Sequence, residues 1–288
     1  MDPLSQTLSK TIDGPVMVHS DLLGVLQNLN IEVRKAIKEM DQNDDLMEEM
    51  TSMLQRIIGE RELWLPSYNY DFGKTGIFDI QNSPSQVGSL AEFFRTKKAQ
   101  WRTDTPMFSH CGIGQKPQKS NSEIMDPVGF QSNFHELVER NGILLFYGVQ
   151  FLPTHTLYVE RMTGKGPLYR YDKTFKGMIL NKGESKLVTL NLHVRPRTLS
   201  LKYRMPFLFE EFISNGMIKK LPNEFGLSYA ISATDLTHYW SEQLNKDPYY
   251  LLDDETKTTM SQLVNQKGRR LNINDFDDQD FDINGRTK

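Results

Sequence analysis

The sequence predicts an α/β protein with a mainly parallel central sheet flanked by helices. Before Pro196, short apolar runs typical of buried strands alternate with stretches of helical periodicity. Polar residues follow directly where several of the apolar runs end. Sheets of this class bind their ligands at the strand ends, so we expect the functional site there.

The first elements can be assigned in chain order. Val16–Val18 follows a Gly-Pro turn and predicts a buried strand that ends at His19 and Ser20. Residues 45–58 repeat apolar side chains at helical spacing and predict an amphipathic helix. ELWLPSYNYDFG then predicts a strand that runs into a polar, aromatic loop, and SPSQVGSLAEFFRTKK predicts a helix capped by serines.

The later elements become less regular. SNFHELVERNG predicts a helix that stops at Gly142, ILLFYGV an apolar strand, and PTHTLYVERM a helix-like segment with Thr154 as a possible cap. We expect one domain over residues 1–250 and a C-terminal segment over 251–288. The end of that segment, INDFDDQDFDINGRTK, is acidic and offers little apolar surface, so we expect a mobile tail.

Composition excludes several classes of protein. The 288 residues are 38% hydrophobic and 25% charged, as in ordinary globular proteins. The net charge of -3 argues against a general nucleic-acid binder. No run approaches the roughly 20 apolar residues that span a bilayer, and the start does not resemble a secretory signal. A single cysteine forms neither an internal disulfide nor a thiolate zinc cluster, so we expect a cytoplasmic protein.

The histidines are the main candidates for chemistry. His19, His110 and His155 each follow an apolar segment beside serine or threonine, whereas His135 and His193 favour structural roles. The histidine spacing does not match a zinc site, so we expect no metal. The Walker loop, the GxGxxG motif and the GxSxG elbow are also absent. Direct acyl transfer between two bound substrates is the chemistry that fits best.

The stretch RTDTPMFSHCGIG places the only cysteine beside a histidine. Neighbouring residues on a strand point to opposite faces, so adjacency does not make a thiolate–imidazole pair. We therefore expect Cys111 to be a packing residue within a binding loop.

Six blocks of sequence resemble one known family. VMVHSDLLGV, LPSYNYDF, SPSQVGSLAEFFR, RTDTPMFS, LVERNGILLFYGV and THTLYVE resemble the aminoglycoside 3-N-acetyltransferase family in the same order and with similar gaps. The resemblance covers roughly residues 1–180. It implies an α/β fold, acetyl-CoA or another acyl-CoA as co-substrate, and an amino group on a sugar as acceptor. A homodimer is compatible with this assignment.

The resemblance also implies roles for individual residues. It places the pantetheine end of coenzyme A near the HSDL loop, and the thioester near the start of the SPSQVGSL helix. Ser109 and His110 would lie at the reacting centre. The donor to the oxyanion would be a backbone amide near Ser20 or a hydroxyl such as that of Ser109. The expected coenzyme A contacts are His19, Ser20, Asp21, Leu22, Ser85, Gly88 and Arg102.

The last block implies the general base. His155 would accept the proton of the attacking amine as a neutral imidazole, and Glu160 would orient it. Family members usually carry histidine three residues before the glutamate, where this chain has Leu157. On a helix, residues five apart lie about 140° from each other. Either the backbone is irregular there or Glu160 orients another group, and His19 or His110 remains an alternative base.

The acceptor is predicted from a further likeness. GPLYRYDKTFKG and RTDTPMFS look more like members that acylate amino-deoxysugars for surface polysaccharides such as O-antigen or capsule. A nucleotide-linked sugar would suit stacking rings and cations. An antibiotic-resistance aminoglycoside acetyltransferase is the alternative, and a non-catalytic coenzyme A or sugar-binding relative is the second. The expected substrate contacts are Tyr68, Tyr70, Asp71, Arg170, Tyr171 and Lys173.

Overall fold

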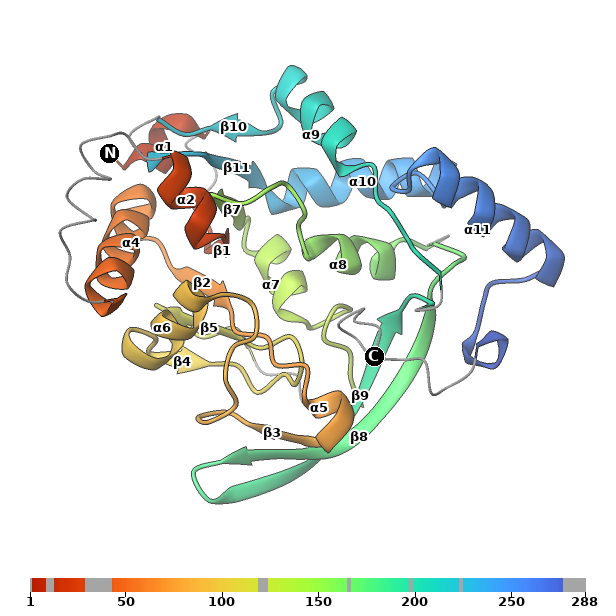
Figure 1. Ribbon diagram of the computed structural model, residues 1–288, viewed down its shortest axis with the longest axis horizontal. Helices are drawn as coiled ribbons and strands as arrows, with labels where there is room; N and C mark the ends of the chain where they lie inside the picture. Colours follow the sequence, from red (N-terminus) through yellow and green to blue (C-terminus); the bar gives the residue numbers. More distant parts are fainter. Residues whose placement is uncertain are drawn as a thin grey trace.

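A seven-stranded sheet forms the centre of the fold, in the order β10-β11-β7-β1-β2-β5-β4 (Figure 1). The computed structural model describes residues 2–8, 13–28, 43–118, 124–164, 167–196, 199–222 and 225–276. The strands of this sheet are β1 (Val16–Ser20), β2 (Leu63–Pro66), β4 (Trp101–Arg102), β5 (His110–Ile113), β7 (Ile143–Tyr147), β10 (Lys219–Lys220) and β11 (Ser228–Ser232).

The parallel part of the sheet is its centre. β1 pairs in parallel with β7 on one side and with β2 on the other. β11 and β10 then continue antiparallel beyond β7, and β5 and β4 continue antiparallel beyond β2. The central strands are apolar runs because both of their faces are buried, as is usual for parallel strands. The predicted α/β class is confirmed, whereas β11 was not predicted from the sequence.

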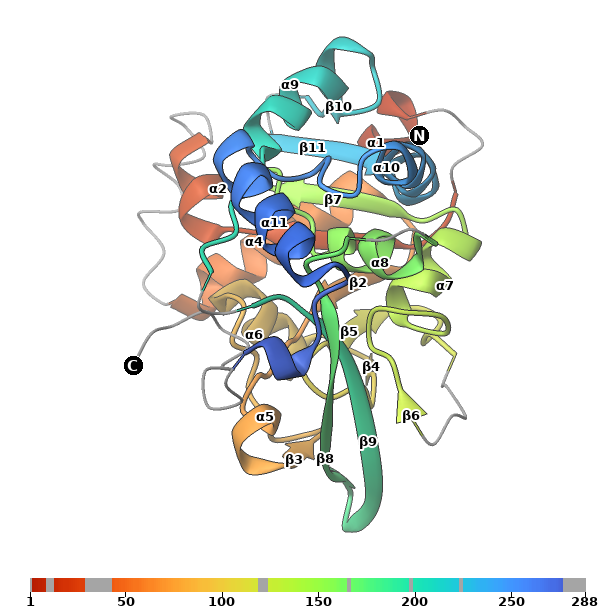
Figure 2. The same ribbon diagram turned by 90° about the vertical axis from the view of Figure 1, so that its right-hand side faces the viewer.

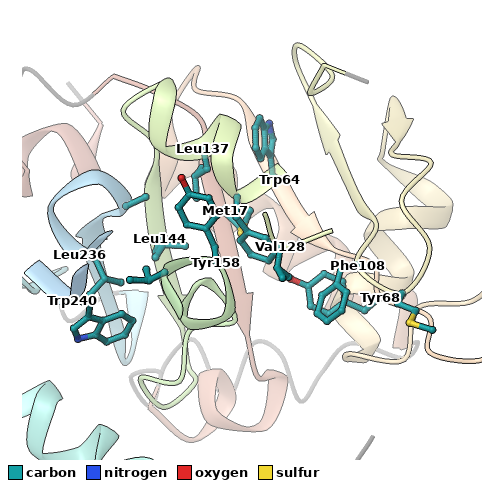
Figure 3. Packing of buried hydrophobic residues seen from close by; sticks show 14 of the residues in the cluster. Met17, Trp64, Tyr68, Phe108, Val128, Leu137, Leu144, Tyr158, Leu236 and Trp240 are labelled. Atoms are coloured by element: carbon teal, nitrogen blue, oxygen red, sulfur yellow. The ribbon is translucent and has the colours of Figure 1, made fainter. Parts of the chain in front are cut away.

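Side chains alternate between two cores on the two faces of the sheet. Val16 and Val18 pack in one core, together with residues of α1 (Pro3–Thr7), α2 (Leu22–Asn28), α4 (Asn43–Ile58) and α6 (Ser89–Lys97). Met17 points to the other core (Figure 3), which includes residues of α7 (Asn133–Glu139), α8 (His155–Met162) and α10 (Ala233–Lys246). Helices therefore cover both faces of the sheet.

The predicted helix starts differ in their capping. Ser132 caps α7 as expected, because its side chain accepts a hydrogen bond from the backbone N–H of His135. The N-cap of α6 is instead Gly88, which makes no side-chain capping bond, so the predicted serine cap is wrong. Thr154 occupies the N-cap position of α8, but its side chain makes no capping hydrogen bond.

A second sheet of four strands, β3-β8-β9-β6, extends from the body of the molecule (Figures 1 and 2). Its long hairpin joins β8 (Tyr171–Asn181) to β9 (Glu184–Val194), with β3 (Ile77–Asp79) and β6 (Ile124–Met125) along its edges. Lys182 and Gly183 both have positive φ, as a two-residue type I′ hairpin turn requires. The short helix α5 (Phe72–Thr75) precedes β3.

The C-terminal part packs on the base of this hairpin. α9 (Met205–Ser214), α11 (Asp254–Lys267) and the 3₁₀ turn η2 (Ile273–Asp275) follow the hairpin. A capping box closes η2, and Phe276 stacks on Tyr171 with ring centroids 5.5 Å apart. The mobile tail stays a prediction, and its first residues, 273–276, form η2 and a ring contact with the hairpin. Residues 277–288 lie outside the described residues.

Candidate active site

A cavity of about 1200 Å³ opens beyond the end of β7. Its wall combines Val149 and Gln150 after β7, the first turn of α8, part of α9 and the base of the hairpin. We define the hairpin base as residues 170–175 and 192–195. The position beyond the end of a central parallel strand is the one expected for a ligand site in an α/β sheet.

His193 is the histidine that lines this cavity, among the residues that the structure describes. It lies directly opposite Asp172 in the hairpin register, and its Nδ1 is 3.1 Å from Asp172 Oδ1. Arg161 Nη1 donates to the same carboxylate oxygen over 2.7 Å, and Arg161 Nε donates to Asp126 over 2.6 Å. The imidazole is therefore oriented by a carboxylate that is itself held in place.

The protonation of this pair follows from its surroundings. The hydrogen bond from His193 and the charge of Arg161 lower the pKa of Asp172 to about 2. Burial lowers the pKa of His193 below its usual value, while the bond to Asp172 opposes that shift. A neutral His193 that donates from Nδ1 to Asp172 carries its lone pair on Nε2. Nε2 is buried and has no hydrogen-bond partner among the described residues.

Glu160 orients a group other than His155. Its carboxylate forms a buried ion pair with Arg170, whose Nε lies 2.5 Å from Glu160 Oε2. The hydroxyl of Tyr169 donates to Oε1 over 2.6 Å. Arg170 also donates to the backbone carbonyl of His193, so Glu160 supports the hairpin base. Of the two alternatives left open by the sequence, these contacts agree with the one in which Glu160 orients another group.

His155 is a core residue. It is fully buried, and its Nε2 lies 2.7 Å from the hydroxyl oxygen of Thr237. The ring packs 5.1 Å from the ring of Tyr158, and burial lowers its pKa to about 3. Thr154 and Thr156 line the cavity on either side of it in the chain, but His155 itself does not. The predicted role of His155 as general base stays a prediction, and its position in the core does not favour it.

Arg102 and Ser109 form a buried hydrogen-bond network with backbone carbonyls. Arg102 donates to the backbone carbonyls of Ser67, Ile80 and Ser83, over 2.7, 3.1 and 2.6 Å. Its Nε donates to Ser109 Oγ, which in turn donates to the carbonyl of Ser67. Both side chains are buried and use their polar groups within the protein. The predicted contact of Arg102 with coenzyme A and the oxyanion role of Ser109 stay predictions, and these bonds within the protein do not favour them.

His110 and Cys111 also turn inward, to opposite faces of the sheet. His110 is fully buried between Asn133, at 2.8 Å from Nδ1, and the hydroxyl of Tyr68, at 3.3 Å from Nε2. Burial lowers the pKa of His110 to about 3, so its predicted catalytic role is not supported. Burial raises the pKa of Cys111 to about 12, and the thiol packs in the core on the other face. The prediction that Cys111 is a packing residue is confirmed.

The loop after β1 lies beside the cavity. The backbone N–H of Asp21 donates to the carbonyl of Tyr147 over 3.1 Å. A Cβ at Gly24 would meet the carbonyl oxygen of Gly148 at 1.7 Å, so only glycine permits this close approach. His19, Ser20, Asp21 and Leu22 therefore flank the chain that leads into Val149 and Gln150. Burial lowers the pKa of His19 to about 4, and its ring packs against Phe146.

The other predicted contacts divide into two groups. Tyr70, Arg170 and Lys173 line the cavity, as expected for substrate contacts. Tyr68 is buried behind them, Asp71 is exposed, and Tyr171 stacks on Phe276. Ser85 and Gly88 precede α6, which packs on the opposite face of the sheet from α8. The positions of these last two residues do not join them to the cavity.

His193 is the residue that sequence reasoning assigned to structure. The signal that could have revealed it is the turn NKGE, because Asp172 and His193 are equally distant from Lys182 and Gly183 along the two strands. An antiparallel hairpin centred on that turn places the two side chains opposite each other.

A match to a family model identifies the family of this chain. Residues 17–245 match the family described as aminoglycoside 3-N-acetyltransferase. The chain belongs to the aminoglycoside 3-N-acetyltransferase family. Membership confirms the predicted N-acyltransferase class and the acyl-CoA co-substrate. The closer likeness to polysaccharide amino-sugar acyltransferases stays a prediction, and a search of curated proteins finds no match.

Solved structures share the fold at low sequence identity. AAC-IIIb in a binary complex with CoASH is 16% identical, with a TM-score of 0.62 over 85% of this chain and 97% of that chain. A variant of aminoglycoside acetyltransferase AAC(3)-IVa in complex with a gentamicin is 20% identical, with a TM-score of 0.61 over 87% and 90%. YokD from Bacillus subtilis is 13% identical, with a TM-score of 0.58 over 85% and 93%.

Two further features of the described residues bear on ligands and location. They contain no group of three histidine, cysteine or acidic side chains arranged to hold a metal ion. Within the same ranges, no helix has the length and apolar character needed to cross a bilayer.

Proposed function

We propose that this chain transfers an acetyl group from acetyl-CoA to the amine of an amino sugar bound in the cavity. The observation that carries the proposal is the cavity itself, which lies beyond the end of β7 in a chain that belongs to an N-acetyltransferase family. Aromatic residues line it, and sugar rings stack on such side chains: Tyr70, Phe108, Phe175, Tyr203, Phe209 and Tyr229.

The comparisons favour an aminoglycoside acceptor over the nucleotide-linked amino sugar expected from the sequence. The family is described by aminoglycoside acetylation, and structural neighbours were solved with a gentamicin, apramycin or sisomicin. These ligands belong to the neighbours, and their identity to this chain is at most 20%. Aminoglycosides are therefore one of several classes of amine to be tested as acceptors.

Coenzyme A would approach along the loop after β1. That loop presses against the end of β7, and the next residues, Val149 and Gln150, line the cavity. The close approach of Gly24 and Gly148 leaves backbone rather than side chains at this edge, which suits a narrow pantetheine arm. His19 and Ser20 would flank the thioester end, and Gln150 would offer an amide to it.

We assign the role of general base to His193. The amine nitrogen of the acceptor attacks the thioester carbonyl carbon, and its proton passes to His193 Nε2. The carbon–sulfur bond then breaks, and the departing sulfur of coenzyme A takes a proton to become a free thiol. Asp172 holds the imidazole through Nδ1 and stabilises the imidazolium that forms. The step needs no covalent enzyme intermediate, which agrees with the inert position of Cys111.

The proposal is tested with acetyl-CoA and a panel of amines. The panel contains gentamicin, apramycin, glucosamine, a phosphorylated glucosamine and a uridine diphosphate amino sugar. We expect at least one acceptor to release free thiol in proportion to an acetylated product seen by mass spectrometry. A protein that binds coenzyme A in calorimetry and releases no thiol with any amine would instead be a non-catalytic relative, and the proposal would be wrong.

A further inference from the structure

We propose that the hydroxyl of Thr154 donates a hydrogen bond to the thioester oxygen of acetyl-CoA, and that a chain of buried hydrogen bonds fixes the direction of this donor. The inference rests on the proposed function, because it concerns the attack on acetyl-CoA in the same cavity. Thr154 lies immediately before α8 and lines the cavity. Its role differs from that of His193, to which the proton of the attacking amine is assigned.

The chain of hydrogen bonds starts at the side-chain amide of Asn133. The amide nitrogen lies 3.3 Å from Thr103 Oγ1 and 3.5 Å from the backbone carbonyl oxygen of Phe108, which only accepts. The same nitrogen lies 2.8 Å from His110 Nδ1. Because the amide nitrogen only donates, Nδ1 accepts, and the proton of the neutral imidazole is on Nε2. Burial lowers the pKa of His110 to about 3, which keeps the ring neutral.

The chain continues through Tyr68 to Thr154. His110 Nε2 lies 3.3 Å from the hydroxyl oxygen of Tyr68, to which it donates. The same hydroxyl bonds to the side chain of Thr154, and burial raises the pKa of Tyr68 well above its usual value, so the phenol stays protonated. Since the phenol oxygen already accepts from His110, its own hydrogen is donated to Thr154 Oγ1. The hydrogen of the Thr154 hydroxyl is then left for a ligand in the cavity.

Two other hydroxyls near the cavity are already used within the protein. Thr156 lines the cavity too, but its Oγ1 donates to the carbonyl of Pro153 over 2.7 Å. Ser109 Oγ donates to the carbonyl of Ser67 over 2.7 Å. Thr154, by contrast, makes no capping hydrogen bond to α8. Of these three hydroxyls, that of Thr154 is the one whose hydrogen is not given to a carbonyl of the described chain.

The bond between Tyr68 and Thr154 joins the segments that follow the two neighbours of β1. In the sheet, β1 lies between β7 and β2 and is parallel to both. Tyr68 follows β2 and Thr154 follows β7, so both lie at the edge where β1 ends at Ser20. The Tyr68 ring packs 5.1 Å from that of Phe108, which lines the cavity (Figure 3). The donor is therefore at the edge of the sheet proposed for the thioester end of coenzyme A.

A donor at the thioester oxygen stabilises the charge that develops there. When the amine attacks, the carbonyl oxygen becomes negatively charged, and a hydrogen bond to it strengthens. As the carbon–sulfur bond breaks, the carbonyl forms again and the hydroxyl keeps its proton. Thr154 accepts from Tyr68 while it donates, and hydrogen bonds in such a chain polarise one another. Asn133, His110 and Tyr68 move no proton in this account and are positioning residues.

The first test observes the carbonyl directly and needs no acceptor. Acetyl-CoA labelled with ¹³C at the thioester carbonyl is bound to the protein, and its carbonyl stretching band is measured by infrared difference spectroscopy. We expect the band to lie at lower wavenumber in the wild type than in Thr154→Val, because a hydrogen bond weakens the carbon–oxygen double bond. Thr154→Ser keeps a hydroxyl and should keep the wild-type band. Calorimetry shows beforehand that each variant binds acetyl-CoA.

Thr163→Val is the matched control on the same helix. The Thr163 hydroxyl donates to the carbonyl of Val159 over 2.7 Å, and this residue is not part of the described cavity wall. Its replacement should change neither the carbonyl band nor the turnover number. Tyr68→Phe removes the bond that directs Thr154 but leaves the threonine hydroxyl in place. We expect it to move the band part of the way towards that of Thr154→Val.

The second test measures turnover with an acceptor identified by thiol release. Thr154→Val should lower the turnover number by roughly a hundred- to a thousandfold, the range for loss of one oxyanion donor, with little change in KM for acetyl-CoA. Tyr68→Phe should lower it by about tenfold, as expected for one lost hydrogen bond. Thr154→Ser should recover most of the turnover that Thr154→Val loses.

Two results would overturn the inference. The carbonyl band of bound acetyl-CoA could be the same in Thr154→Val as in the wild type, or the variant could turn over like the wild type. Failure of the proposed function looks different, because the wild type then releases no thiol with any amine while the carbonyl band still reports the donor. A wild-type protein that does not bind acetyl-CoA would overturn both.

Discussion

The segment from Arg102 to Gly114 and the hairpin base contain the same kinds of side chains but use them differently. Both carry an arginine, a histidine and hydroxyl or carboxylate groups. In the segment, Arg102, Ser109 and His110 bond to other parts of the protein and are buried. In the hairpin base, His193 and Arg195 contribute to the wall of a cavity, and the buried Nε2 of His193 makes no hydrogen bond among the described residues. A polar group is left for chemistry only where the protein does not already supply its hydrogen-bond partner.

The largest effect is expected where the hairpin base is anchored. Glu160→Gln leaves the Arg170 charge buried without its counter-ion, and we expect the free energy of unfolding to fall by about 3–5 kcal/mol. Urea denaturation measures this change. The double substitution Glu160→Gln with Arg170→Met should recover much of the loss, because it removes the unpaired charge. A loss below about 1 kcal/mol in the single variant would show that the pair does not hold the hairpin.

The next largest effect is expected where Arg102 is replaced, because its side chain is the centre of a buried hydrogen-bond network. Arg102→Met should lower the free energy of unfolding by about 2–4 kcal/mol, because the Ser109 hydroxyl and the backbone carbonyls of Ile80 and Ser83 lose the donor that Arg102 provides. Coenzyme A affinity, measured by calorimetry on the folded protein, should stay unchanged. Full stability combined with weaker coenzyme A binding would restore the role that the sequence predicted for Arg102.

A smaller effect is expected at the C-terminal end of the described chain. Truncation after Leu271 removes η2 and the stacking of Phe276 on Tyr171, an aromatic contact worth about 0.5–1.5 kcal/mol. The melting temperature should fall by a few degrees, measured by circular dichroism. Truncation after Phe276 is the matched control and should leave it unchanged. Equal melting temperatures for the two truncations would mean that the contact adds no stability.

The sequence predicted the fold well where local patterns decide it. The apolar runs at Val16–Val18 and Ile143–Tyr147 became the central parallel strands, because buried strands need side chains that are apolar on both faces. The helical spacing of apolar residues over 45–58 predicted α4, because that spacing gives a helix one apolar face to bury. β11 was missed because SYAIS is short and gains its place only by pairing with β7.

The site was harder to predict because its partners are distant in the chain. Arg102 bonds to Ser67, 35 residues away, and His155 bonds to Thr237, 82 residues away. Single-residue context does not reveal such long-range bonds, so both residues looked available, although Nδ1 of His155 makes no hydrogen bond among the described residues. Tyr70, Arg170 and Lys173, which were predicted as substrate contacts because rings and cations suit a sugar that carries phosphates, do line the cavity. The pairing of Asp172 with His193 follows from the hairpin turn at Lys182 and Gly183, which fixes the register of the two strands.

The central claim is that His193, oriented by Asp172, is the base on the cavity wall while His155 belongs to the core. The most direct test compares the turnover numbers of His193→Gln and His155→Gln, with an acceptor identified by thiol release. Calorimetry with coenzyme A confirms beforehand that each variant is folded.

The account predicts that His193→Gln lowers the turnover number by roughly a hundred- to ten-thousandfold, the range for loss of a general base, while His155→Gln stays close to wild type. The wild-type rate should fall as the pH drops through the His193 pKa, which lies below 6.5. Because the bond to Asp172 raises that pKa, Asp172→Asn should move the fall to lower pH. Loss of turnover in His155→Gln, with His193→Gln fully active, would contradict the account.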